Sequence, residues 1–218
     1  MASTGFCPAD HIFCADFEEA SGLPPGAVMA APDETNLTFG TADFMILDST
    51  NPFAGRQSFK VTSPGSFHYR MLGVTVPTSF WVRLYIKSDQ DIGQPDHNGF
   101  FSAMPNPDYH QATGVALSEQ FGCLQLNNSD MRFPTSTACG AATALPKNIW
   151  HCMSAHFDGT TGNVQVFAEQ VQIINAVAWQ YAMATFNTFE FGYGNYNAPG
   201  ASVWYDNIAI TTSPLSCP

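Results

Sequence analysis

A carboxylate lies inside the most apolar stretch of the chain, and this position has chemical consequences. The stretch runs from Ala201 to Ile210 and alternates large apolar residues with polar or small ones, which is the pattern of a half-buried strand. Asp206 lies within it. Because a buried carboxylate is costly without a partner, we expect Asp206 to face a cation. Because the stretch is nearly C-terminal, we expect this strand to be inserted between earlier ones.

Basic and aromatic side chains gather on one face of a second predicted strand, from Phe80 to Lys87. Successive side chains of a strand point to opposite faces, so one face carries Val82, Leu84 and Ile86. The opposite face carries Arg83, Tyr85 and Lys87. Aromatic and basic groups together suit the floor of a sugar-binding groove, and we expect these three residues to contact a polysaccharide.

Other catalytic arrangements have no supporting motif. The sequence contains no GxSxG segment of the kind that positions a nucleophilic serine. A glycosidase needs paired carboxylates, and Glu169 and Glu190 lie on predicted strands without forming a recognisable pair. His151 and His156 are five residues apart on a predicted strand, so we do not expect a zinc site.

The composition excludes several classes of partner. The chain has 218 residues, a formal net charge of -11 and only 7 Lys and Arg residues. So few basic groups argue against binding to nucleic acid and to an anionic membrane surface. No apolar run approaches the length of a membrane span. We expect neither nucleic acid nor membrane as a partner, and a monomeric protein.

The cysteines indicate an exported protein. The 6 cysteines form no metal-type CxxC pair, and an even number without such motifs favours disulfides over buried thiols in a cytosolic protein. Six cysteines allow 15 pairings. We expect the pairs Cys7–Cys14, Cys123–Cys139 and Cys152–Cys217. The polar sequence after Met1 is no export signal, so we expect Met1 to stand where such a signal has been removed.

The arrangement of apolar segments predicts the fold. About a dozen short strand-like segments, separated by Gly, Pro and Asn, indicate an all-β sandwich, specifically a concanavalin-like jelly roll. We expect two antiparallel sheets, a concave groove and one domain spanning residues 1–218. Residues 150–157 and 163–168 are predicted to form a hairpin. Only residues 175–183 have the pattern of a short helix.

The order of several motifs resembles one family. Asp16–Phe17–Glu18 is followed by Ala54–Gly55–Arg56–Gln57, then by His97 ahead of a strand that ends at Met104. The chain closes with Phe191–Gly192–Tyr193–Gly194–Asn195–Tyr196 and Val203–Trp204–Tyr205–Asp206. This order resembles the secreted, cellulose-induced proteins of wood-degrading fungi, which are similar to glucuronan lyases. The resemblance covers most of the chain from about residue 14 onward.

The resemblance implies a structural Ca²⁺ ion. The family's carboxylate ligands match Glu18 and Asp206, and further ligands match the backbone carbonyl of Ala54 and the side-chain oxygen of Gln57. Asp48 and Ser49 are possible additional ligands. Hard oxygen ligands of this kind suit calcium. Such an ion would tie the first strand, a long loop and the last strand together without taking part in catalysis.

The resemblance also implies cleavage of an acidic polysaccharide by β-elimination. This reaction removes the C5 proton of a uronate and expels the 4-O-linked sugar, so it needs a base, an acid and a group that neutralises the carboxylate. His97 and Tyr196 match groove residues of the family as acid, base or polarising group. Gln120 and Gln125 would bind the carboxylate, while neighbouring sugars would contact Tyr193, Arg83, Tyr85 and Lys87.

One departure from the family affects substrate recognition. Where the fungal relatives carry an arginine, this chain has Val115–Ala116–Leu117, and Gln125 replaces an aspartate. The resemblance therefore implies a different mode of carboxylate recognition. A glucuronan-like lyase is the expected function, and two alternatives stay open: a non-catalytic carbohydrate-binding module of the same fold, and a glucanase-type hydrolase.

Overall fold

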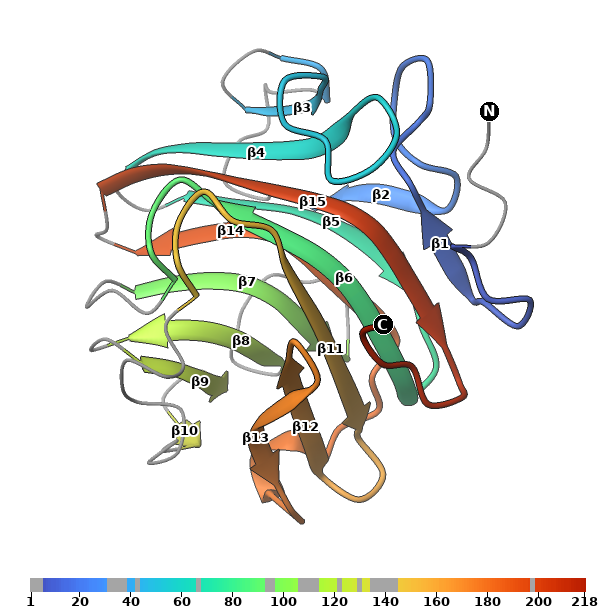
Figure 1. The fold of residues 1–218 in the computed structure, drawn as a ribbon. Helices are drawn as coiled ribbons and strands as arrows, with labels where there is room; N and C mark the ends of the chain where they lie inside the picture. The colour runs from blue at the N-terminus through green and yellow to red at the C-terminus, as the bar shows by residue number, and fades with distance from the viewer. Residues whose placement is uncertain are drawn as a thin grey trace.

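The chain folds as a sandwich of two antiparallel β-sheets (Figure 1). The computed structural model describes residues 6–30, 39–41, 44–65, 68–92, 97–105, 114–120, 123–128, 131–133, 145–196 and 199–218. For residues 97, 120, 123, 131–133 and 196, only the backbone is described.

One sheet has eight strands. They are β1 (Phe13–Ala15), β3 (Met45–Asp48), β4 (Ser58–Gly65), β6 (Ser79–Ser88), β11 (His151–Asp158), β12 (Asn163–Ala168), β13 (Val171–Ala176) and β15 (Pro199–Thr211). Their spatial order is β13-β12-β11-β6-β15-β4-β3, and β1 also pairs with β15. The β11–β12 pair is the predicted hairpin.

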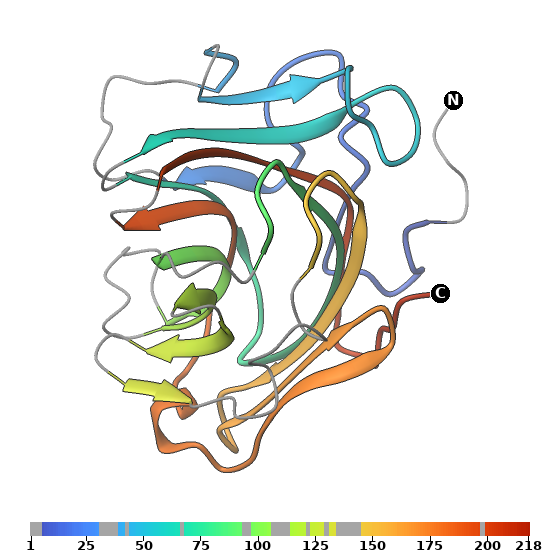
Figure 2. The same ribbon diagram turned by 60° about the vertical axis from the view of Figure 1, so that its left-hand side comes forward.

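The other sheet has seven strands. They are β2 (Ala27–Ala30), β5 (His68–Thr75), β7 (His97–Met104), β8 (Val115–Gln120), β9 (Cys123–Asn128), β10 (Met131–Phe133) and β14 (Thr188–Tyr196). Their order is β10-β9-β8-β7-β14-β5-β2. Both sheets are curved, and Figure 2 shows them stacked. The predicted all-β jelly-roll architecture is confirmed.

The C-terminal strand β15 occupies the centre of the eight-stranded sheet, as its apolar sequence predicts. It pairs with β6 on one side and with β4 on the other, while β1 pairs with its C-terminal half. A β-bulge interrupts its register with β6 between Asp206 and Ala209. Asn207 in this bulge has a positive φ of 49°, a conformation that Asn tolerates better than most residues.

Aromatic side chains fill the space between the sheets. Phe59, Phe191 and Tyr205 are completely buried, and their ring centroids lie 5.8–6.2 Å apart. The Tyr205 hydroxyl donates hydrogen bonds to the backbone carbonyls of Phe100 and Gly192, at 2.7 and 2.6 Å. Since Phe100 and Gly192 belong to the seven-stranded sheet, this one side chain links the two layers.

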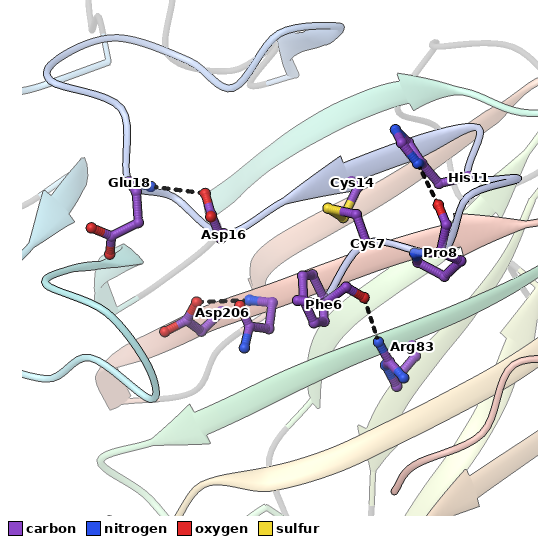
Figure 3. The surroundings of a disulfide bond; sticks show 10 residues. Phe6, Cys7, Pro8, His11, Cys14, Asp16, Glu18, Arg83 and Asp206 are labelled. Carbon is purple, nitrogen blue, oxygen red and sulfur yellow. Dashed lines mark hydrogen bonds between the residues drawn. A yellow bond between two sulfur atoms is a disulfide. The ribbon is translucent and has the colours of Figure 1, made fainter. Parts of the chain in front are cut away.

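The disulfides follow the sequence prediction as far as it can be compared. Cys7–Cys14 and Cys152–Cys217 are both formed, and the first lies at the start of the chain near Arg83 (Figure 3). The expected Cys123–Cys139 pair involves Cys139, which lies outside the described residues.

The expected helix over residues 175–183 is wrong. Strand β13 continues to Ala176, and only the 3-10 turn Gln180–Ala182 follows. Ile174 and Ala176 are buried, so pairing with β12 takes up the first part of the segment. Among the described residues, no helix is both long enough and apolar enough to cross a membrane.

The link between the sheets can be tested by removing one oxygen. Tyr205→Phe should lower the free energy of unfolding by about 1–3 kcal/mol, because two carbonyls lose their buried donor. Urea denaturation checks this, with Tyr181→Phe, at a partly exposed position, as the control. Equal stability of the two variants would show that the hydroxyl contributes nothing to the association of the sheets.

Candidate functional site

The Asp206 carboxylate holds the loop that precedes β4. Its Oδ2 accepts hydrogen bonds from the backbone N–H groups of Phe53 and Ala54, at 2.9 and 3.1 Å. Its Oδ1 accepts one from the N–H of Asn207 at 2.7 Å. Asp206 is completely buried, so these three N–H groups replace the water that a carboxylate normally binds.

Glu18 holds the next residues of the same loop. Its Oε1 accepts hydrogen bonds from the backbone N–H groups of Arg56 and Gln57, at 2.7 and 3.1 Å. Its Oε2 forms an ion pair with the Arg56 guanidinium at 2.9 Å. Gly55 is required between these contacts: it has a φ of 69°, and a Cβ there would lie 2.3 Å from Glu18 Oε1.

Backbone strain accompanies both carboxylates. Phe17, directly before Glu18, has a φ of 55°, and Asn207, directly after Asp206, has a φ of 49°. A bulky residue such as Phe is an outlier in this region, and conformations of this kind gather at ligand clamps and other functional sites. In Figure 3, Glu18 and Asp206 come from separate parts of the chain and lie on the same side of the disulfide region.

The two carboxylates have opposite electrostatic environments. Burial raises the pKa of Asp206 to about 7, in spite of its three hydrogen bonds, and the charge of Glu18 adds to the rise. Burial also tends to raise the pKa of Glu18, but hydrogen bonds from Arg56 and Gln57 outweigh it and lower the pKa overall. The repulsion places the two groups within electrostatic range of each other, as a shared cation site requires.

The residues around this loop fit a hard cation in part. A carboxylate offers about four lone-pair positions, and among the described residues Glu18 and Asp206 each accept three hydrogen bonds, so each keeps capacity for one more ligand bond. The Gln57 amide donates to the carbonyls of Phe17 and Glu19, which leaves its own oxygen to accept. No cluster of three or more His, Cys, Asp or Glu side chains suited to a metal occurs within the described ranges.

A second candidate surface is the outward face of the seven-stranded sheet, which we call the polar face. Its side chains alternate with buried core residues such as Phe189 and Phe191 of β14 and Leu117 of β8. The pairing registers define two rows across the strands. One row is Tyr69, Gly194, Gly99, Ser118 and Gln125, and the next is Gly73, Glu190, Ser102, Ala116 and Asn127.

Glu190 is the buried acid of the polar face. The hydroxyl of Ser102 donates to its Oε2 at 3.3 Å, and its Oε1 has no hydrogen-bond partner. Burial raises its pKa to about 7, against the effect of the Ser102 hydrogen bond. The sequence indicated only that Glu190 lies on a strand; its burial and missing partner follow from the packing of the sheet.

The backbone brings some of the predicted catalytic residues together. Tyr196 of β14 lies opposite His97 of β7, and Gln120 follows Glu119, the partner of Asn98 in the same β7–β8 pair. Gln125 lies on the polar face opposite Ser118. The side chains of His97, Tyr196 and Gln120 lie outside what the structure describes.

Comparison with known proteins gives the family. The model of the Cip1-like core domain, within the polysaccharide lyase-like group, matches residues 29–213. The chain belongs to this Cip1-like family. A search of curated proteins found no match.

Solved structures agree with this family on the fold. The chain is similar to the cellulose-induced protein Cip1, with 22% identity and a TM-score of 0.73 over 94% of this chain and all of that one. It is also similar to AlgAT5, an alginate lyase of polysaccharide lyase family 7, with 7% identity and a TM-score of 0.59 over 87% and 95% of the two chains. A botulinum neurotoxin type C structure, described by its interaction with two ganglioside molecules, matches with 13% identity and a TM-score of 0.63, over 95% of this chain and 49% of that one.

Arg83, Tyr85 and Lys87 do not share a surface with the other predicted site residues of this Cip1-like chain. They lie on the outward face of β6, in the eight-stranded sheet, whereas His97, Gln125 and Tyr196 belong to the seven-stranded sheet. The expectation that one groove contains both sets is wrong, because alternation along a strand fixes a face but does not say which sheet the strand joins.

Each of these three side chains is engaged by a neighbouring segment. The Tyr85 ring stacks on Phe53, with centroids 3.7 Å apart, and Arg83 donates to the Phe6 carbonyl at 3.1 Å. Lys87 donates to the Asn51 side chain at 2.8 Å. These contacts hold the N-terminal segment and the loop before β4 against the sheet.

Tyr193 lies in the core rather than on the polar face. It is buried, its hydroxyl donates to Asn98 Oδ1 at 2.8 Å, and the Asn98 amide donates to Glu119 Oε2 at 3.1 Å. Its position on β14 differs from that of Glu190 and Gly194 by an odd number of residues, which places it on the opposite face. Because its side chain is buried in the core, Tyr193 does not lie on the polar face, where we expected it to contact a sugar.

The raised pKa of Glu190 predicts a pH-dependent stability. Between about pH 4.5 and pH 7 the unfolded chain releases a proton that the folded chain keeps, so stability should fall by up to about 3 kcal/mol as the pH rises. Glu190→Gln should remove this part of the decline. Thermal or urea unfolding of both proteins at pH 4.5 and pH 8 checks it; parallel curves would contradict the assignment.

Proposed function

We propose that this chain is an exported polysaccharide lyase that cleaves a uronic-acid polymer, glucuronan or a similar one, by β-elimination. The observation that carries the proposal is the polar face, where a Cip1-like chain with a polysaccharide lyase-like fold pairs Tyr196 with His97 and carries Gln125 two strands away in the same sheet. The disulfides support an oxidising, extracellular location.

The proposed mechanism divides the reaction among three residues. His97 and the Gln125 amide hydrogen-bond the uronate carboxylate and so stabilise the negative charge that develops when C5 loses its proton. Tyr196, in its phenolate form, takes the C5 proton as the general base and later gives it up to water. The C4–O bond then breaks, and the leaving oxygen needs a proton from a further group.

The polar face is an unusual binding surface for an acidic substrate. Among the side chains that the structure describes, the polar face carries no Lys or Arg. Val115 and Leu117 point into the core, and Ala116 is the residue of this segment on the polar face. Because the segment that carries an arginine in the fungal relatives offers only Ala116 to this face, a second candidate is a non-catalytic carbohydrate-binding module.

The two candidates differ in their products. A lyase generates a conjugated 4,5-unsaturated uronate that absorbs in the ultraviolet, so wild type should raise the absorbance with glucuronan, alginate, pectate or glucuronoxylan. His97→Ala should lower the rate about 100-fold or more, while His11→Ala, an exposed control, should not. New reducing ends without this absorbance would indicate a hydrolase, and retardation in polysaccharide gels without any product would indicate a binding module.

A structural Ca²⁺ ion forms part of the proposal. Glu18 and Asp206 would hold it through their carboxylates, with the Ala54 carbonyl and the Gln57 side-chain oxygen as further ligands. The ion would supply positive charge between two carboxylates that repel each other. Its role is to fix the loop before β4 to β15, and no step of the reaction passes through it.

Chelation tests the calcium proposal. Calcium at 100 times its dissociation constant should stabilise the fold by about 2.7 kcal/mol, so EDTA should lower the melting temperature of wild type and added Ca²⁺ should restore it. Asp206→Asn should abolish this response, while Asp158→Asn, on an exposed turn, should keep it. An equal melting temperature with EDTA and with Ca²⁺ at matched ionic strength would rule out the ion.

A further inference from the structure

Buried polar atoms of the polar face lack hydrogen-bond partners. Glu190 Oε1 and Ser118 Oγ are examples, and both residues are at most 1% exposed. An unpaired buried polar group costs about 1–3 kcal/mol, and native proteins keep few of them. Both lie on the polar face, so the cost is concentrated on the surface where the proposed substrate would bind.

Tyr69 lies in the same row as Ser118, above a gap made by two glycines. It is opposite Gly194 in the β5–β14 pair, and Gly194 is opposite Gly99 in the β14–β7 pair. A Cβ on Gly194 would lie 2.9 Å from Cζ of the Tyr69 ring, and one on Gly99 would lie 3.6 Å from its hydroxyl oxygen. The glycines therefore make room for the Tyr69 ring to lie across β14 with its hydroxyl toward β7.

This position puts Tyr69 next to the proposed reacting groups. Gly194 is two residues from Tyr196 along β14, a spacing of about 7 Å on the same face of a strand. Gln125 lies in the same row as Tyr69. Tyr69 is partly exposed, whereas Glu190 is buried, so Tyr69 is the one of the two that can touch a ligand.

The surroundings of Tyr69 keep its hydroxyl protonated. Burial raises its pKa, and the negative charge of Glu190 adds to the rise. A phenol held in this form is a proton donor rather than a base. The proposed mechanism lacks such a donor for the leaving oxygen.

We propose that Tyr69 is a further catalytic residue, the general acid of the elimination. As the C4–O bond breaks, the Tyr69 hydroxyl gives its proton to the leaving oxygen. The phenolate then regains a proton from water, to which the partly exposed side chain has access. This inference rests on the proposed lyase function and extends it to the leaving-group step.

Tyr69→Phe keeps the ring and removes the acid. On a uronic-acid polymer that wild type cleaves, the variant should lower kcat about 100-fold or more, with KM within about threefold, while Tyr181→Phe behaves as wild type. A synthetic uronoside with a nitrophenoxy group at C4 needs no protonation of its leaving group, so wild type and Tyr69→Phe should cleave it at similar rates. An equal loss on both substrates would overturn the role of general acid.

The outcomes separate this inference from the function on which it rests. If wild type yields no unsaturated product from any acidic polymer, the proposed function fails and the role of Tyr69 fails with it. If wild type is active and Tyr69→Phe keeps full activity, only the inference fails. Circular dichroism melting of each variant establishes that a loss of activity is not a loss of fold.

Discussion

The burial of the Asp206 carboxylate in the central strand is the constraint on which much of the structure depends. The group lies in β15, which pairs with three other strands, and it has no access to water. It must therefore find its hydrogen bonds within the protein, and the bulge at Asn207 and the loop before β4 supply them. Glu18 repeats this arrangement three residues further along the loop. The two carboxylates thus fasten the start of the chain, this loop and the last strand to one another.

The attachment of the loop before β4 to β15 affects both faces of the sandwich. In the loop before β4, Phe53 stacks on Tyr85 and the Asn51 side chain accepts a hydrogen bond from Lys87. The outward face of β6 therefore anchors other segments. On the inner side of the neighbouring strand β15, Tyr205 reaches across to the carbonyls of Phe100 and Gly192. The position of the seven-stranded sheet, and of the polar face on its far side, is therefore tied to the strand that contains Asp206.

The polar face has few charges that the structure describes, yet it contains a buried acid. Glu190 and Ser118 keep unpaired polar atoms there, whereas the buried Tyr193, Asn98 and Glu119 of the same sheet are joined by hydrogen bonds. Natural sequences keep such local conflicts mainly at functional sites. The membership of the chain in a polysaccharide lyase-like family and this conflict point to the same surface.

Sequence alone was enough for the fold class, the central place of the last strand, the β11–β12 hairpin, two disulfides and the inward face of β6, because alternation and cysteine usage are local signals. The family resemblance paired Glu18 and Asp206 as calcium ligands; the structure shows both carboxylates holding one loop, and the ion stays a proposal. Sequence alone failed where the answer depends on which strands are neighbours: Arg83, Tyr85 and Lys87 joined the other sheet, and Tyr193 turned into the core. Only the tertiary structure decided that Tyr69 lies across the two glycines Gly194 and Gly99, because strand pairing joins residues far apart in the chain, which no local pattern encodes.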